Sequence, residues 1–222
     1  MRHYRVLLAL SSFLAFVPAA HATIATAYTN VTGGSQNYNG DLAMLFTVNS
    51  PIVVSALGVY NQSGSGTITG TISVEIYNLT TNSIAVGPVA FNGAYGFCSG
   101  STNDVCQSVP AVLLGLGNYE VEAVGFSNTD LNANIGAPFN NTGPTLNTNG
   151  GLISFTGAAY DSSITLDHPI TCIGCAAAPS PQNTQFGAGT FEFADVPEPA
   201  TFGLVGISLL SLAALRRNGR VK

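Results

Sequence analysis

The distribution of cationic side chains constrains this 222-residue chain more than any other feature. Its six Lys and Arg residues lie at the two ends, and none occurs from Val6 to Leu215. Residues 23–196 instead carry ten acidic residues, so salt bridges to Lys or Arg cannot stabilise this part of the chain. Such a body is repelled by phosphate backbones, which excludes nucleic acid as a direct partner. An anionic polysaccharide would also be repelled, unless divalent cations bridge the two.

The body alternates between apolar and polar residues, as strands do. Strands are predicted over Leu42–Asn49, Ile52–Asn61, Thr67–Asn78, Asn118–Phe126, Gly150–Gly157 and Thr184–Val196. Turn signals separate them, and no stretch shows a helical period. Low charge with high apolar content argues against disorder. The length suits one domain, and we predict an all-β sandwich or jelly roll over residues 23–195.

The N-terminus has the three parts of a secretory signal peptide. Arg2 and Arg5 precede an apolar run, Val6–Val17, and Ala20-His21-Ala22 supplies a small-x-small ending. We expect a signal helix over residues 1–22, cleavage after Ala22 and export from the cytoplasm.

The C-terminus has a short apolar run between a Pro-Glu-Pro sequence and a group of cations. Ala200–Leu215 would form a helix about 24 Å long, shorter than a hydrocarbon core of about 30 Å. The cations after it would hold the end of the chain on the cytoplasmic side. We therefore expect a short transmembrane helix, with the body outside.

This tail resembles the PEP-CTERM protein-sorting domain of Gram-negative bacteria, and we assign residues 196–222 to it. The matching residues are Val196, Pro197, Glu198, Pro199, Ala200, Thr201, Arg216 and Arg217. The resemblance implies recognition and removal of the tail by an exosortase, in species that make exopolysaccharide. A permanent single-span anchor remains the alternative.

The body also resembles a β-sandwich module that often carries such tails. The resemblance rests on "LAMLFTVNSPIVVSALGVYNQSGSG", "ISVEIYN" and "GLGNYEVEA", within Leu42–Phe126. These are core and turn residues, so the resemblance concerns the fold alone.

Four cysteines in an exported chain indicate disulfides, and three pairings are possible. We predict Cys98 with Cys106, across a short loop, and Cys172 with Cys175 in "CIGC". A redox role for Cys-x-x-Cys would need a helix start and a lowered thiol pKa, for which this segment offers no signal.

The other polar residues give no catalytic constellation. Glu120 and Glu122 share one strand face, which we interpret as an outward polar face rather than a glycosidase pair. His168 is predicted in a loop, and Asp167 next to it cannot easily orient it as a catalytic triad requires.

Two further patterns bear on ligands. Asp130, Asn132 and Asn134 alternate as in calcium loops, but the glycine is one residue late and Asn141 stands where a glutamate is needed. They remain a candidate Ca²⁺ site. Thr67, Thr69 and Thr71 are predicted to point outward from one strand.

These observations predict a non-enzymatic exported protein, disulfide-bonded and without an obligatory cofactor. It would pass through the inner membrane to the cell surface or the exopolysaccharide matrix, with a role in adhesion or biofilm structure. Its partners would be the exosortase and a polysaccharide or cell-surface glycan. The alternatives are an extracellular glycan-active enzyme and a ligand- or ice-binding module.

Overall fold

The computed structural model describes residues 23–29, 34–134, 144–169 and 187–196. Within these ranges the chain forms strands and no helix. The body, Thr23–Asp195, is one compact unit. Its longer strands are β3 (Leu42–Val48), β4 (Ile52–Tyr60), β5 (Thr67–Asn78), β6 (Ser83–Ala94), β8 (Asp104–Leu114), β9 (Gly117–Val124), β11 (Ile153–Tyr160) and β12 (Gly189–Asp195). The short ones are β1 (Ala25–Thr26), β2 (Tyr28–Thr29), β7 (Gly96–Phe97) and β10 (Thr145–Leu146).

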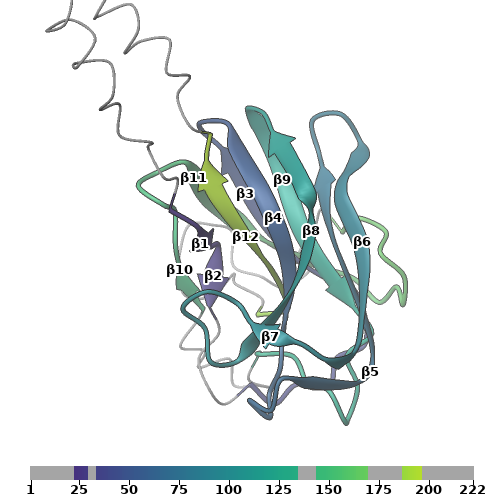
Figure 1. Ribbon diagram of the computed structural model, residues 1–222. Helices are drawn as coiled ribbons and strands as arrows, with labels where there is room; N and C mark the ends of the chain where they lie inside the picture. The colour runs from purple at the N-terminus through teal and green to yellow at the C-terminus, as the bar shows by residue number, and fades with distance from the viewer. Residues whose placement is uncertain (1–22, 30–33, 135–143, 170–186, 197–222) are drawn as a thin grey trace, which may run out of the picture. The chain divides into compact units, whose positions relative to one another are not determined.

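These strands make two five-stranded antiparallel sheets that pack as a sandwich (Figure 1). One sheet has the order β1-β12-β4-β8-β7 and is called the β4 sheet below. The other has the order β11-β3-β9-β5-β6 and is called the β9 sheet. β2 and β10 pair separately. The prediction of an all-β sandwich is confirmed.

The core lies between the two sheets and follows the alternation read from the sequence. Met44, Phe46 and Val48 of β3 are buried on one face, as predicted. Phe46 stacks on Tyr119 of the same sheet, with ring centroids 5.6 Å apart. It also packs against Phe191 of the β4 sheet at 4.9 Å. Aromatic packing across the layers therefore joins the sheets, and the described residues form no ion pair between them.

Six of the longer strands lie where the sequence predicted strands, but β6 and β8 were missed. Both contain proline, which removes a ladder hydrogen bond and therefore argues against a strand in a sequence. β6 tolerates Pro88 because it is the edge strand of its sheet. β8 tolerates Pro110 because the register with β4 shifts between Val54 and Ala56, opposite that proline.

A disulfide joins Cys98 to Cys106, as predicted. Cys106 lies in β8 and Cys98 directly follows β7, so the bond holds the last strand pair of the β4 sheet. It packs over Gly58, where an added Cβ would lie 2.8 Å from Cys98 Sγ and 2.9 Å from Cys106 Sγ. Gly58 therefore supplies the space that the disulfide occupies. Cys172 and Cys175 lie outside the described residues.

Replacing Cys98 and Cys106 by alanine should lower the free energy of unfolding by about 2.5 kcal/mol, from the entropy of the short loop that the bond closes. Urea denaturation measures this change. The comparison uses a Cys172→Ser/Cys175→Ser background, so that only one bond differs. Dithiothreitol should lower the stability of the parent in this background and leave the double alanine variant unchanged. Equal stability of the two proteins without reductant would contradict the prediction.

Candidate functional site

Two glutamates of β9 lie on the face of the β9 sheet that points away from the core. Because side chains alternate along a strand, the core position of Tyr119 places Glu120 and Glu122 on the opposite face. The register sets Glu122 beside Glu75 of β5, and Glu120 beside Tyr77. The prediction that these two glutamates share the outward face is confirmed, but this face is not open to solvent as expected, since both have 0% of their surface exposed.

The segment 161–169, called the covering segment below, contacts these glutamates through His168. It follows β11 and is held over the outer face of the sheet by Asp41, which directly precedes β3. The backbone N–H of Asp161 donates to the carbonyl oxygen of Asp41 at 3.2 Å. The backbone N–H of Asp167 donates to Asp41 Oδ2 at 3.1 Å. Tyr38 donates its hydroxyl to the carbonyl of Asp161.

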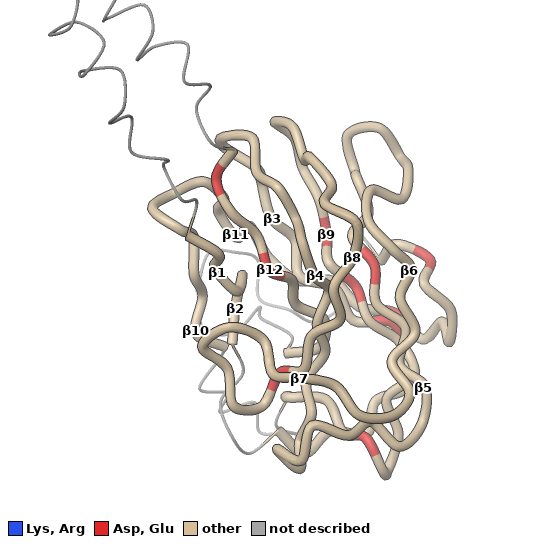
Figure 2. Tube along the Cα trace, in the orientation of Figure 1, with Lys and Arg blue, Asp and Glu red and all other residues tan. Residues whose placement is uncertain are grey.

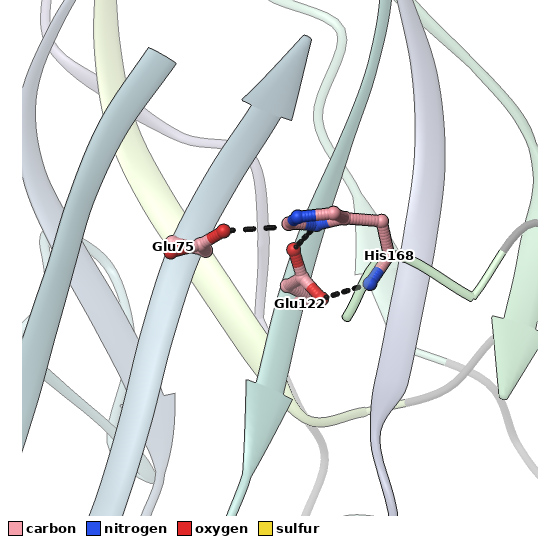
Figure 3. A group of neighbouring side chains, drawn as sticks. All are labelled: Glu75, Glu122 and His168. Atoms are coloured by element: carbon pink, nitrogen blue, oxygen red, sulfur yellow. Dashed lines mark hydrogen bonds and ion pairs between the residues drawn. The ribbon is translucent and has the colours of Figure 1, made fainter. Parts of the chain in front are cut away.

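His168 carries the covering segment into contact with three glutamates. Its Nδ1 lies 2.6 Å from Glu122 Oε1, and its backbone N–H donates to Glu122 Oε2 at 3.2 Å (Figure 3). The same Nδ1 lies 3.7 Å from Glu75 Oε1 and 4.0 Å from Glu120 Oε1. Asp41, Glu75, Glu120, Glu122 and His168 together are called the acid–histidine cluster.

The backbone and the ring of His168 are both held in place. Its φ of 67° lies in the left-handed region, which is uncommon for a residue other than glycine. With this backbone, the N–H and the ring nitrogen reach the two oxygens of one carboxyl group. The imidazole also stacks on Tyr77, with ring centroids 3.4 Å apart and planes within 10°. His168 lies outside the strands, as predicted, but β9 and β5 orient it rather than its neighbour Asp167.

Burial raises the pKa of every carboxyl group in this cluster. The pKa of Asp41 rises to about 9, chiefly through burial and also through hydrogen bonding with Glu122. Burial raises the pKa of Glu120 to about 8, and the negative charges of Asp41 and Glu75 add to the effect. Burial likewise raises the pKa of Glu122 to about 8 and raises that of Glu75. Figure 2 shows that the described chain has acidic positions and no Lys or Arg to oppose these shifts.

The cluster therefore favours binding protons or cations over attack on a sugar. Glycosidases place two carboxyl groups about 5 Å or more apart across an open sugar cleft. Here both glutamates are fully buried, and His168 of the covering segment contacts them. His168 is the most accessible member, with 26% of its side chain exposed.

The three candidate calcium ligands are all buried, and their oxygens accept hydrogen bonds from the backbone. Asp130 Oδ1 accepts from Thr69 N–H at 2.9 Å, and Asp130 Oδ2 accepts from Gly70 N–H at 2.7 Å. These two N–H groups lie where the register between β5 and β6 is interrupted. Asp130 therefore replaces a missing ladder partner.

The two asparagines serve the same loop. Asn132 Oδ1 accepts from the N–H of Asn134 at 3.0 Å, and Asn134 Oδ1 accepts from Gly187 N–H at 3.0 Å. These bonds give all three side chains a structural role. Calcium binding by them stays a prediction.

A pocket of about 300 Å³ opens beside Asp130, at the start of β5. Its lining is rich in hydroxyl and amide groups. It comprises Tyr60, Asn61, Gln62, Ser63, Ser65, Thr67, Ile68, Thr69, Thr129 and Asp130. Thr67 and Thr69 are exposed, as predicted, and so is Thr71, which lies outside the lining.

Comparison with known proteins concerns mainly the C-terminus. Residues 195–218 match the family model described as the PEP-CTERM protein-sorting motif. The tail carries this sorting motif. The match confirms the PEP-CTERM resemblance, and the motif indicates an exported protein that an exosortase sorts. No curated protein matches the chain.

One solved chain with a low similarity comes from the 2.6 Å structure of T=1 particles derived from infectious bursal virus. The identity is 11% and the TM-score is 0.23, over 81% of this chain and 41% of that chain. This chain thus spans about two fifths of the length of the solved one. At this TM-score the match carries no argument about function.

The predicted signal peptide and almost all of the PEP-CTERM tail, from Pro197 onward, lie outside the described residues, so the predicted transmembrane helix does too. Within the ranges that are described, no helix has the length and apolar character needed to cross a membrane.

The raised pKa values predict that the metal-free protein loses stability as the pH rises from 5 to 9. Between the ordinary carboxyl pKa of about 4 and the raised values, the folded state holds protons that the unfolded state has released. Each such carboxyl then lowers the free energy of unfolding by up to about 1.4 kcal/mol per pH unit. Urea denaturation with a chelator present, at several pH values, measures the slope.

Glu120→Gln should make this slope shallower, because it removes one proton-binding carboxyl and leaves the shape of the side chain. Glu192→Gln is the matched control, since Glu192 lies in the β4 sheet, where it accepts a hydrogen bond from Ser99 N–H. It should keep the wild-type slope. Stability that is constant or rises with pH in the wild-type protein would contradict the assignment.

Proposed function

We propose that this protein is a non-enzymatic component of the cell surface or of the exopolysaccharide matrix, with a role in adhesion or biofilm structure. The observation that carries the proposal is the PEP-CTERM tail at residues 195–218, on a body that is one compact sandwich. The tail accounts for sorting by an exosortase. The body is then the part that acts after export.

The burial of the acid–histidine cluster supports a non-enzymatic role. Glu120 and Glu122 are the carboxyl pair that the sequence offers for glycan hydrolysis, and both have 0% exposure. A sugar could reach them only if the covering segment left the sheet. That movement would break both contacts between His168 and Glu122 and the stacking on Tyr77.

The pocket beside Asp130 supports association with a neutral glycan. Hydroxyl and amide side chains supply hydrogen-bond donors and acceptors without charge. An anionic polysaccharide would be repelled by a body with ten acidic residues and no Lys or Arg. Divalent cations would be needed to bridge the two.

Deleting the exosortase should leave a membrane-bound precursor that still contains Arg216 and Arg217. Mass spectrometry of the C-terminal peptide from membrane and extracellular fractions tests this. Glu198→Ala, inside the motif, should also slow processing, whereas Glu192→Ala, outside it, should not. A wild-type protein that keeps its complete tail at the cell surface would contradict removal by an exosortase and favour a permanent anchor.

A glycan array probed with the processed protein, with and without Ca²⁺, should identify a neutral glycan. Thr67→Val/Thr69→Val should then weaken binding about tenfold, since each lost hydrogen bond contributes about 0.5–1.5 kcal/mol. Thr71→Val is the matched control, because Thr71 is exposed on the same strand and does not line the pocket. Equal binding by all three proteins would contradict this site.

Two outcomes would favour the alternative functions. Release of sugar from the polysaccharide, abolished by Glu120→Gln and Glu122→Gln, would indicate an enzyme. Thermal hysteresis of the purified protein would indicate ice binding.

A further inference from the structure

The acid–histidine cluster collects more carboxyl groups than its own chain can neutralise. Asp41, Glu75, Glu120 and Glu122 are each at most 2% exposed, and the three glutamates approach a single imidazole. Residues 23–196 contain no Lys or Arg, and His168 is the one histidine outside the predicted signal peptide. Buried charges are tolerated when they are paired or when they coordinate metals. A cation from solution is therefore the partner that this cluster lacks.

The ligand atoms lie at separations that a small metal ion would need. One atom each from Glu75, Glu122 and His168 lie within 4.8 Å of one another (Figure 3). Four ligands at Zn²⁺ bond lengths of about 2.0–2.1 Å stand about 3.3 Å apart in a tetrahedron. The distances from His168 Nδ1 to the oxygens of Glu122, Glu75 and Glu120 are 2.6, 3.7 and 4.0 Å. These three distances lie on both sides of the tetrahedral value. Side-chain shifts below about 1 Å would therefore bring the four atoms to bonding positions around the ion.

Glu120 gives independent evidence that this cluster binds an ion. Its side chain has 0% exposure, and neither of its carboxyl oxygens has a hydrogen-bond partner among the described residues. Native structures leave few buried polar atoms unpaired, and a bound ion is one of the established reasons for such an atom. Oε1 of Glu120 lies 4.0 Å from the same Nδ1 that Glu75 and Glu122 approach.

We propose that Glu75, Glu122 and His168, with Glu120 as the fourth ligand, bind a divalent transition-metal ion of the Zn²⁺ type. The imidazole nitrogen selects this class, because Zn²⁺ takes four nitrogen and oxygen ligands whereas Ca²⁺ takes six to eight oxygens. The side chain of His168 reaches solvent, which gives the ion a path into the site. This site is separate from the candidate calcium loop at Asp130 and does not depend on the proposed glycan binding.

Such an ion would join the covering segment to two strands. His168 belongs to the covering segment, Glu75 to β5, and Glu120 and Glu122 to β9. In its absence, the contacts of His168 with Glu122 and Tyr77 hold this part of the segment. Metal binding should therefore stabilise the folded protein and protect residues 161–169 from local opening.

The test titrates the chelated, processed protein with ZnCl₂, followed by calorimetry and by thermal unfolding. A Cys172→Ser/Cys175→Ser background is needed, because a Cys-x-x-Cys pair can bind Zn²⁺ itself. Zn²⁺ at about 100 times its dissociation constant should raise Tm by about 5–10 °C. Co²⁺ should give the visible absorption of a tetrahedral site with nitrogen and oxygen ligands. CaCl₂ at the same concentration should raise Tm much less.

Variants separate metal binding from a purely structural role. Glu122→Gln and Glu75→Gln each replace a buried carboxyl group by an uncharged amide of the same shape, so they should leave the metal-free protein folded and at least as stable at pH 7.5. Both should weaken Zn²⁺ binding about 100-fold or more, as should His168→Ala. Glu192→Gln, in the other sheet, should bind Zn²⁺ as the parent does.

Two results would overturn the proposal. One is the absence of heat and of any Tm shift with millimolar ZnCl₂. The other is Zn²⁺ binding that Glu75→Gln, Glu122→Gln and His168→Ala all leave unchanged, which would place the ion elsewhere in the chain.

Discussion

The absence of Lys and Arg from residues 23–196 is the constraint on which the rest of this structure depends. Every buried carboxyl group must be satisfied without a permanent cation. Asp130 uses the backbone N–H groups of β5, at 2.9 and 2.7 Å. Asp104 accepts a hydrogen bond from the hydroxyl of Ser101 at 2.6 Å. The acid–histidine cluster has one imidazole for four carboxyl groups, so it is the place where this constraint is least satisfied.

Most of the fold could be predicted from the sequence, because the core forms where apolar residues alternate. β3 shows this directly, since Met44, Phe46 and Val48 point into the sandwich as their spacing predicts. β6 and β8 were missed because Pro88 and Pro110 interrupt the same pattern. An edge position and a register shift remove the penalty of these prolines, and neither can be recognised before the pairing of the strands is known.

The candidate site could not be predicted in the same way. Alternation correctly places Glu120 and Glu122 on the face away from the core, but it cannot say what covers that face. The covering residue His168 is 46 positions from Glu122 along the chain, and Asp167 is 126 positions from Asp41. The available signals are a lone histidine and a pair of alternate glutamates between apolar residues, in a body without Lys or Arg. Taken separately, each of these suits an ordinary loop or an exposed strand.

The acid–histidine cluster stabilises the contact between a loop and a sheet less than apolar packing could. Replacing buried ionic groups with apolar residues of similar volume is often neutral or stabilising. Leu45, opposite Glu120 on β3, shows that this face accepts an apolar residue. The left-handed backbone of His168 adds a further cost, and it directs both an N–H and a ring nitrogen to one carboxyl group. Holding the covering segment on the sheet would by itself require neither the buried carboxyl groups nor the left-handed backbone of His168. Together they keep carboxyl groups and an imidazole within reach of one another, where a proton or a metal ion from outside the cell determines how firmly the segment is held.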